Sequence, residues 1–208
     1  MTIQVNIISY GYAHLAAHCI ESVLSQTRKP DRVLVVDDGK HDGIEKMCRY
    51  PVEILVREKN LGIVGNFNDV LMNHTYSDKT MFLGADNYLR PDALELMDRE
   101  EADIVSSDIA LVGTEVEKFR QGLITEYSYG YHVWRFLPVD IDRGNYIHGS
   151  SLYRVDRAKK YGYKESGGAH TEEDWMLWKQ MILGGATHRH IAEPLLYYRR
   201  HKSNFNKI

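Results

Sequence analysis

Two apolar runs flanking one helical pattern place the strongest constraint on how this chain can fold. Residues 3–8 (IQVNII) and 32–36 (RVLVV) are rich in β-branched side chains, so each predicts a buried strand. Between them, apolar residues recur at helical spacing from Leu15 to Leu24. A strand, a helix and a second strand in this order predict a βαβ unit with two parallel strands.

The same alternation continues through the first hundred residues. Residues 52–56 (VEILV) and 81–83 (MFL) predict a third and a fourth strand, and a helical pattern over residues 63–71 separates them. The 208 residues suit one domain of this kind. We therefore predict a single compact α/β domain over residues 1–208, with a Rossmann-like, mostly parallel sheet flanked by helices.

The second half has a less regular pattern. Residues 102–108 predict a strand, residues 111–119 a hairpin arm, and residues 127–136 an irregular aromatic segment. Residues 146–154 predict a further strand, followed by a short helix over residues 155–161.

The chain's last elements are a helix and two strands. Trp175, Trp178, Met181 and Ile182 recur at helical spacing, and Thr171 with Asp174 predicts a capping box at the start of that helix. The final apolar stretches, residues 187–191 and 194–198, predict an edge strand and a second short strand.

Composition and short motifs give no support to several classes of function. The formal net charge of −3 provides no basic field for nucleic acid, and no apolar run is long enough to span a bilayer. The two cysteines, Cys19 and Cys48, lack metal-type spacing, so we expect reduced thiols and a cytoplasmic protein. Neither GxGxxG after the first strand nor GxxxxGK[ST] occurs, which argues against a dinucleotide fingerprint and a P-loop.

Acidic residues follow two of the predicted strands. Asp37 and Asp38 come directly after residues 32–36, and Asp86 follows residues 81–83. Ligands of open α/β sheets bind at the carboxyl ends of strands, where a carboxylate can hold Mg²⁺ or Mn²⁺ or accept a hydrogen bond from a nucleobase. The alternative is that these acids cap turns and helices.

Several stretches in one order resemble a known family. They are SYGY at residues 9–12, VVDDGKHDG at 35–43, KNLGIVGNFN at 59–68 and FLGADNYLRPDAL at 82–94. They resemble the nucleotide-sugar-binding half of family 2 glycosyltransferases, which have the GT-A fold. EDWMLW at 173–178 and YRRH at 198–201 extend the resemblance to the C-terminal part.

The resemblance implies a metal-dependent, inverting, hexosyltransferase-type enzyme that moves a sugar from a nucleotide-diphosphate donor, with a UDP-sugar favoured. Residues 1–100 would bind the donor, and residues 101–208 would bind a hydroxyl-bearing, carbohydrate-type acceptor and carry catalysis. The donor-contacting positions that it implies are Ser9, Tyr10, Asp37, Asp38, Asn60, Gly62, Asn66, Ala85, Asp86 and Arg199. Asp86 and His201 would hold the divalent metal, Mn²⁺ or Mg²⁺.

The same resemblance places the catalytic base at the start of the last helix. Asp174 matches the acid that deprotonates the acceptor, and Glu173 is the second candidate. A carboxylate suits this work when burial or a neighbouring acid raises its pKa toward neutrality. Acids in a helix's first turn also favour the helix dipole, so a structural role for both is the alternative.

The chain departs from the family pattern at one important place. The earlier acid of the DxD-type motif is missing, because Gly84 and Ala85 occupy its positions. A nucleotide-sugar-binding module without catalysis is therefore one alternative. A metal-dependent hydrolase built from scattered histidines is a second, although no HExxH spacing occurs; those histidines are His148, His170, His188, His190 and His201. A nucleotidyltransferase is a third, but it would normally show a basic, Gly-rich N-terminal loop.

Overall fold

The first half of the chain builds a parallel sheet of four strands, as its apolar runs predict. The computed structural model describes residues 1–208 except 122, 124, 167–171, 203 and 205–208. The four strands are β1 (Ile3–Ser9), β2 (Arg32–Asp37), β3 (Glu53–Val56) and β4 (Lys79–Gly84). Ser9 of β1 pairs with Asp37 of β2, and Ile8 pairs with Gly84 of β4. The carboxyl ends of these strands therefore meet at one edge of the sheet.

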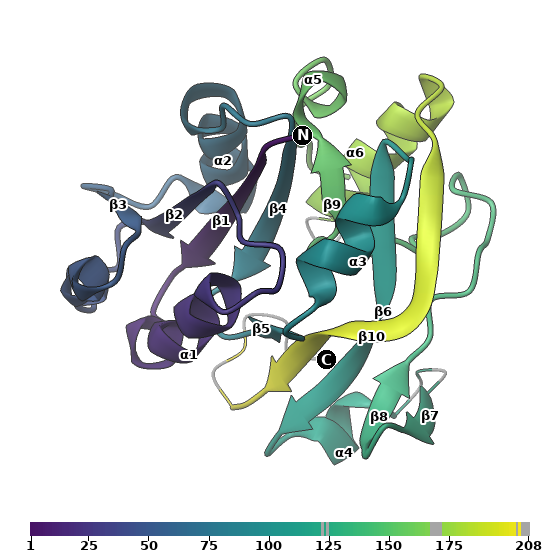
Figure 1. Cartoon of the computed structure of the whole chain (residues 1–208), viewed down its shortest axis with the longest axis horizontal. Helices are drawn as coiled ribbons and strands as arrows, with labels where there is room; N and C mark the ends of the chain where they lie inside the picture. The colour runs from purple at the N-terminus through teal and green to yellow at the C-terminus, as the bar shows by residue number, and fades with distance from the viewer. Residues whose placement is uncertain (122, 124, 167–171, 203, 205–208) are drawn as a thin grey trace.

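The remaining strands continue the same sheet with two long strands that run parallel to each other and with several short ones. The long strands are β6 (Ile104–Gly113) and β10 (His188–Arg200). The short strands are β5 (Tyr88–Leu89), β7 (Thr125–Ser128), β8 (Tyr131–Trp134) and β9 (Leu152–Arg154), which all pair antiparallel. The order is β3-β2-β1-β4-β9-β6-β10-β5, with β8 and β7 added beside β6 (Figure 1).

Helices cover both faces of the sheet, which confirms the predicted α/β architecture (Figure 1). On one face lie α1 (Ala13–Leu24), α3 (Ala93–Arg99) and a 3₁₀ helix (Ile44–Arg49). On the other lie α2 (Gly62–Asp69) with a π-helical turn (Val70–His74), α5 (Val155–Ala158) and α6 (Glu173–Leu183). A short α4 (Val116–Phe119) follows β6.

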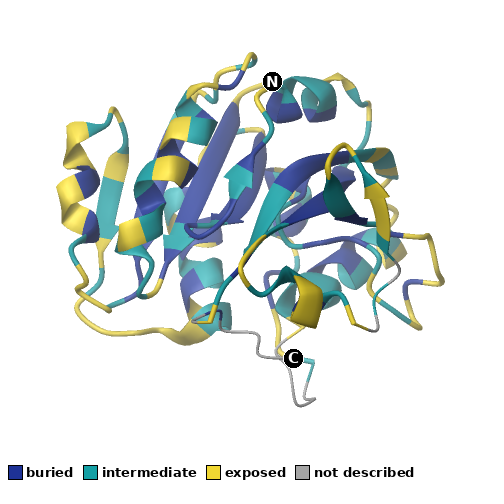
Figure 2. Ribbon diagram, turned by 90° about the horizontal axis from the view of Figure 1, so that it is seen from below, coloured by how far each residue is buried: buried dark blue, intermediate teal, exposed yellow. Residues whose placement is uncertain are grey.

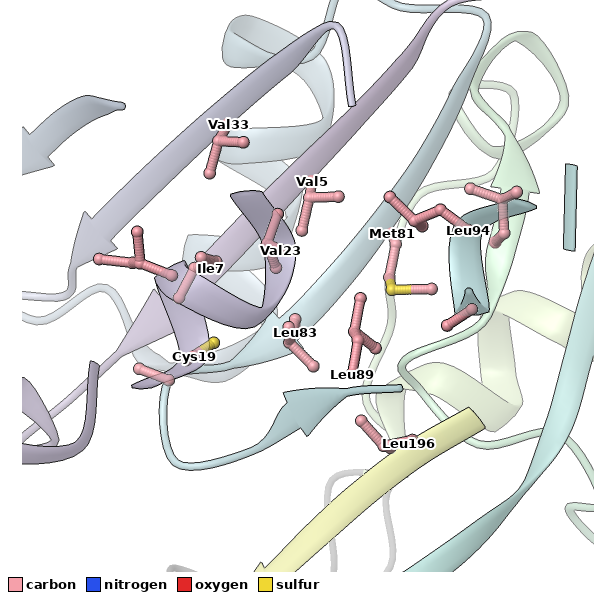
Figure 3. Packing of buried hydrophobic residues seen from close by; sticks show 14 of the residues in the cluster. Val5, Ile7, Cys19, Val23, Val33, Met81, Leu83, Leu89, Leu94 and Leu196 are labelled. Carbon is pink, nitrogen blue, oxygen red and sulfur yellow. The ribbon is translucent and has the colours of Figure 1, made fainter. Parts of the chain in front are cut away.

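Alternating side chains of the strands feed two apolar cores, one on each face. The first joins β1, β2 and β4 to α1 and α3, and its members include Val5, Ile7, Cys19, Val23, Met81, Leu83 and Leu94 (Figure 3). The second contains Phe82 from β4 and Trp178 from α6. Figure 2 shows the strands mostly buried between helices whose outer faces are exposed. Burial of this kind contributes about 1.5–3 kcal/mol per large apolar side chain.

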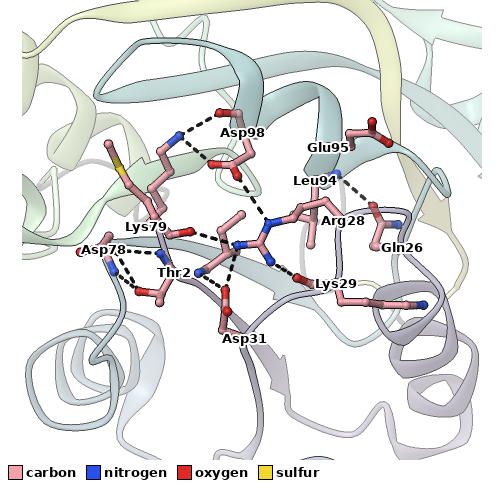
Figure 4. A network of polar contacts seen from close by, with 12 residues as sticks. Thr2, Gln26, Arg28, Lys29, Asp31, Asp78, Lys79, Leu94, Glu95 and Asp98 are labelled. Carbon is pink, nitrogen blue, oxygen red and sulfur yellow. Dashed lines mark hydrogen bonds and ion pairs between the residues drawn. The ribbon is translucent and has the colours of Figure 1, made fainter.

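Polar side chains tie the chain together at the amino ends of the strands (Figure 4). Lys79, at the start of β4, is buried and pairs with Asp98 at 3.0 Å, and the Arg28 guanidinium contacts Asp98 at 3.5 Å and Asp31 at 2.9 Å. A cavity of about 500 Å³ borders Lys79 and Asp98. Its lining mixes both signs of charge, and it lies at the opposite end of β4 from the predicted ligand edge.

The largest correction concerns the last strands. In place of the two predicted strands, an edge strand at 187–191 and a second at 194–198, β10 is a single strand that pairs with β6 along its length and with β5 only at Leu196 and Tyr197. Its register with β6 shifts on both sides of Pro194. Because proline cannot donate to the ladder, a bulge there lets the strand continue, whereas sequence alone indicated a break.

Three further predictions need changes in the region before α6. The predicted hairpin arm at 111–119 ends as α4, and the aromatic segment at 127–136 forms most of the β7–β8 hairpin. The strand at 146–154 is confirmed only for β9. The predicted capping residue Thr171 lies outside the described residues.

Candidate functional site

Asp37 and Asp38 lie at the carboxyl end of β2 and are both buried. The Asp37 carboxylate accepts main-chain hydrogen bonds from Lys40 at 2.9 Å and His41 at 2.8 Å, so it closes the turn that follows β2. Asp38 Oδ1 accepts the main-chain N–H of Leu61 at 3.0 Å, from the loop after β3. Desolvation raises the pKa of Asp38, which hydrogen bonds and the charge of Arg57 partly counter.

Arg57 joins the loop after β3 to α2 and to Asp38. Its Nε donates to Asn66 Oδ1 at 2.8 Å, lies 3.8 Å from Asp38 Oδ1, and a terminal nitrogen bonds Asp69 at 2.7 Å. Asn60 is exposed, and its side chain accepts the main-chain N–H of Gly62. Asp38, Asn60, Gly62 and Asn66 are thus brought into one neighbourhood, with Arg57 as a link that the sequence did not predict.

Gly39 lets the two loops approach each other closely. Its φ is +78°, and a Cβ there would lie 2.4 Å from the main-chain carbon of Lys59. We expect Gly39→Ala to lower the free energy of unfolding by at least about 3 kcal/mol, because left-handed strain and backbone overlap add. Urea unfolding measures this loss.

Gly130→Ala is the matched control for Gly39→Ala. Gly130 has a φ of +80° but no atom within 4 Å of its Cβ position, so only the backbone strain of about 1–2 kcal/mol applies. Equal losses in the two variants would show that the close approach at Gly39 has no energetic weight.

Ser9 and Tyr10 lie where β1 ends. Ser9 is fully buried, and its hydroxyl has no hydrogen-bond partner within the described part of the chain. A buried hydroxyl in that state is uncommon. Tyr10 is 46% exposed, and the Lys40 ammonium lies 5.3 Å from its ring centroid. An aromatic face, a cation and a buried hydroxyl therefore meet the edge that carries Asp37 and Asp38.

Asp86 and His201 come together although they are far apart in sequence. His201 Nε2 lies 3.3 Å from Asp86 Oδ2, and the Asn204 amide donates to the same oxygen at 2.9 Å. Asn204 Oδ1 also accepts the main-chain N–H of His201 at 2.6 Å. Desolvation raises the pKa of the Asp86 carboxyl, while its bonds to His201 and Asn204 act against that rise.

Gly84 and Ala85 differ in how they support Asp86. A Cβ at Gly84 would lie 2.8 Å from Asp86 Oδ1, so the glycine makes room for this carboxylate. Ala85 is fully buried, and its N–H donates to the Ile8 carbonyl at 2.9 Å. Any contact of Ala85 with a nucleotide sugar would therefore depend on the Ala85 carbonyl oxygen.

Arg199 points toward α1. Its guanidinium lies 2.8 Å from His18 Nδ1 and 5.3 Å from the Tyr88 ring centroid, and its main-chain N–H donates to Asn87 Oδ1 at 2.9 Å. The next residue, Arg200, is buried with its guanidinium 3.9 Å from the Phe119 ring centroid. Strand alternation in β10 thus sends these two cations to different environments.

Asp174 lies in the first turn of α6, beside a loop from before β9. Its Oδ1 accepts the main-chain N–H of Trp175 at 2.7 Å and the Asn145 amide at 3.3 Å. Desolvation, helped by the charge of Glu173, raises the pKa of Asp174 to about 7. A carboxyl group with this pKa can accept a proton near neutral pH.

Tyr163 connects the region of this acid to α2. Its main chain exchanges two hydrogen bonds with the Asn68 side chain on α2, at 2.7 and 2.9 Å. Its hydroxyl shares a hydrogen bond of 2.7 Å with Tyr153. Burial raises the pKa of Tyr163, and Tyr153 and the charges of Asp174 and Glu173 add to the rise. Asp174 therefore lies over the same face of the sheet as α2.

The histidines of the described residues do not form one metal site. His188 and His190 both contact the Ser106 hydroxyl, at 2.8 and 2.9 Å, and His190 also lies 3.1 Å from Asp108. Burial lowers the pKa of His148 to about 3. Across the described residues, no group of three or more His, Cys, Asp or Glu side chains could hold a metal ion. The histidine-based hydrolase is therefore not favoured, and His170 lies outside the described residues.

Comparison with known proteins identifies the family. The family model described as glycosyl transferase family 2 matches residues 5–162, which is most of the chain. The chain belongs to glycosyl transferase family 2. This confirms the resemblance that the motifs carried, and the predicted fold agrees with the structure.

Two curated glycosyltransferases extend the comparison. The chain is 24% identical over 184 residues to the uncharacterized glycosyltransferase YwdF of Bacillus subtilis (strain 168), an alignment that spans 84% of this chain and 66% of YwdF. It is 22% identical over 231 residues to the bifunctional glycosyltransferase pgtA of Dictyostelium discoideum, spanning 90% of this chain and 30% of pgtA. The chain therefore spans less than two thirds of either relative.

Solved structures show the same fold. The S. aureus TarS 1–349 complex with UDP-GlcNAc gives a TM-score of 0.72 at 17% identity, covering 98% of this chain and 60% of that one. The mannosyltransferase PcManGT of Pyrobaculum calidifontis, in complex with GDP-Man and Mn²⁺, gives 0.67 at 16% identity, covering 98% and 58%. At such identities the likeness establishes the fold alone.

Three amide side chains of this family 2 chain were not predicted as site residues. Asn204 bonds Asp86, Asn87 bonds the main chain of Arg199, and Asn145 bonds Asp174. Asn87 directly follows Asp86, which is a weak signal. Asn145 lies 29 residues from its partner, and no local pattern distinguishes it from other asparagines.

Proposed function

We propose that this chain transfers a sugar, with inversion, from a nucleotide-diphosphate donor to an acceptor hydroxyl, using a divalent metal. The observation that carries the proposal is the pairing of buried acids at one sheet edge, Asp38 and Asp86, with Asp174 on α6, whose pKa is about 7. Membership in family 2 supports sugar transfer. The nucleotide sugars bound by TarS and PcManGT support the donor class.

The side chains around Asp86 suit a hard divalent cation. Asp86 offers an oxygen ligand, Oδ2, and His201 offers a nitrogen ligand, Nε2, and these two atoms lie 3.3 Å apart. The Asn204 amide donates a hydrogen bond to the same Asp86 oxygen. Mg²⁺ sites commonly use one or two protein carboxylates together with substrate phosphates and water. Asp86 and His201 would hold the ion, which when bound offsets the negative charge of the leaving diphosphate as a Lewis acid.

The chain's own residues divide the remaining work. Asp38 and Tyr10 receive the nucleobase, and Ser9 offers its buried hydroxyl to the nucleoside. The loop with Asn60, Gly62 and Asn66 shapes the other wall, and Asp37 keeps the turn closed. Arg199 breaks its contact with His18 and then places its positive charge near the diphosphate. UDP is our first choice of nucleotide.

Asp174 is the proposed base, ahead of Glu173. The acceptor hydroxyl gives its proton to the Asp174 carboxylate as its oxygen bonds to the anomeric carbon. The bond from that carbon to the diphosphate oxygen breaks, and the electron pair leaves with the nucleotide diphosphate. Attack opposite the leaving group inverts the anomeric centre.

Residues 1–100 would form the donor-binding half and residues 101–208 the acceptor and catalytic half. Tyr127 and Tyr129 of the β7–β8 hairpin are 69% and 61% exposed, so they are available to a carbohydrate acceptor. Trp134 instead packs on Phe136, with ring centroids 4.6 Å apart. No helix of the described chain is long and apolar enough to cross a membrane.

A thermal-shift panel with UDP, GDP, dTDP and CDP, each with and without Mn²⁺, tests the donor half. Ligands that bind the native state raise its stability by mass action, by about 2.7 kcal/mol at a concentration 100 times Kd. We expect one nucleotide to raise the melting temperature only when Mn²⁺ is present. No shift with any nucleotide would contradict the proposal. A shift without transfer to any acceptor would favour the binding module that has lost catalysis.

A further inference from the structure

The loop before β9 wraps around the first turn of α6. Asn145 Nδ2 donates to Asp174 Oδ1 at 3.3 Å, and the Trp175 indole N–H donates to the Ile141 carbonyl at 2.7 Å. These two contacts join residues 141–145 to Asp174 and to the next residue, Trp175. The carboxylate is therefore held by a segment outside its own helix.

The orientation of the Asn145 amide is set by its second partner. The main-chain N–H of Ile147 donates to Asn145 Oδ1 at 3.0 Å, and a main-chain N–H can only donate. The oxygen of the amide must therefore face Ile147, which leaves Nδ2 for Asp174. Ile147 is fully buried, so it anchors this turn in the second core.

Gly149 occupies the other side of the carboxylate. A Cβ added to Gly149 would lie 3.3 Å from Asp174 Oδ2, which is tighter than ordinary contact, and at an ordinary 3.6 Å from Asp174 Cβ. Asn145 and the Trp175 N–H thus act on Oδ1, whereas Gly149 leaves space beside Oδ2.

We propose that Asn145 is a positioning residue for Asp174, which fixes Oδ1 so that Oδ2 is presented beside Gly149 to the acceptor hydroxyl. This inference rests on the proposed function, in which Asp174 is the base. A positioned carboxylate matters because proton transfer requires hydrogen-bond geometry to the hydroxyl as well as a suitable pKa.

Burial, followed by the charge of Glu173, has the largest effect on the pKa of Asp174. Glu173 precedes it on α6 and raises its pKa, and Tyr163 faces it from the loop after α5. The Asn145 amide and the Trp175 N–H stabilise the ionised form. Removing the Asn145 donor should therefore raise the pKa of Asp174 by about one unit.

The experiment compares Asn145→Ala, Asn145→Asp and Gly149→Ala with wild type. Carboxyl-carbon NMR titration follows Asp174, whose signal is assigned by its loss in Asp174→Asn, and kcat is measured across pH. We expect Asn145→Ala to move the Asp174 pKa and the basic group of the pH profile upward together by about one unit. Asn145→Asp keeps the bond from Ile147 but places a second carboxylate beside Asp174, so its shift should be larger. Gly149→Ala should lower kcat while leaving KM for the donor unchanged.

Asp140→Ala is the matched control. Asp140 Oδ1 accepts the main-chain N–H of Asp142 at 3.0 Å, the same two-residue turn that Asn145 makes with Ile147. Asp140→Ala removes this hydrogen bond and weakens the loop, but it does not change a contact to Asp174. The pH profile of kcat should therefore not move. Thermal melts of all variants confirm folding.

The outcomes separate this inference from the proposed function. An Asp174 pKa that does not move in either Asn145 variant overturns the inference alone and leaves sugar transfer standing. A pKa that moves while the pH profile stays fixed overturns the base role of Asp174, and the inference with it. A uniform loss of kcat at every pH in Asn145→Ala, matched by Asp140→Ala, assigns Asn145 to loop structure and also overturns it.

Discussion

Asp174→Asn is expected to lower kcat for sugar transfer by about 10²–10⁴-fold, the usual range when a general base is removed. The substitution keeps the size of the side chain and an oxygen for the Trp175 N–H, so donor binding should be unchanged. Wild-type transfer should fall as pH drops through about 7, because the base must be ionised and the pKa of Asp174 is raised to about 7. Initial rates across pH, with nucleotide release as the readout, measure both effects.

The raised pKa of Asp174 also predicts how Asp174→Asn affects stability. A raised carboxyl pKa means that the ionised form is disfavoured in the folded state, so this group costs stability above pH 7 and costs none below its ordinary pKa. Asp174→Asn should therefore melt no lower than wild type at pH 8. Full activity in this variant would contradict the assignment of Asp174 as the base.

Glu173→Gln distinguishes the two acids. The Glu173 charge raises the pKa of Asp174, so removing that charge should lower the Asp174 pKa. The pH below which the transfer rate falls should then also be lower. We expect a smaller loss of kcat at pH 8 than in Asp174→Asn. The reverse order of losses would exchange their roles.

The order of strands and helices in the first half was predictable because apolar residues in each element follow the spacing typical of a buried strand or of a helix. Strands β1, β2 and β4 are buried on both faces and appear as short apolar runs, and α1 shows a clear helical stripe. In the second half, β10 was divided at Pro194, because sequence cannot show that a register shift against β6 accommodates it. Partners that are distant in sequence decide such strands, and one chain read alone does not reveal them.

The site divides along the same physical line. Asp38 and Asp86 follow predicted strands, and Asp174 lies in a motif that resembles the family, so local sequence was enough to propose these three acids. Asn204 and Asn145 act through side-chain contacts across 118 and 29 residues, and asparagine has no periodicity that indicates such a partner. Gly84, which occupies a position of the missing acid, also makes room for the Asp86 carboxylate, and sequence alone did not indicate this steric role.

Asp86→Asn is expected to remove the metal-dependent part of nucleotide binding, weakening it by at least about 100-fold, since loss of a metal ligand costs more than the 10–100-fold typical of its supporting residues. Burial disfavours the ionised form of Asp86 and so raises its pKa. An uncharged asparagine does not incur this cost of burying a charge, so the metal-free variant should melt no lower than wild type. Titration calorimetry with UDP, with and without Mn²⁺, measures the first effect, and thermal melts measure the second.

Lys79→Met provides the contrast for Asp86→Asn. Lys79 lies at the opposite end of β4 and pairs with Asp98, so this substitution changes a buried charge of the same strand far from the nucleotide edge. It should lower stability, because it leaves Asp98 without its 3.0 Å partner, yet retain the Mn²⁺ dependence of UDP binding. If Asp86→Asn kept that dependence, the ion would have to bind elsewhere, and the pairing of Asp86 with His201 and Asn204 would be a purely structural contact between β4 and the C-terminal segment.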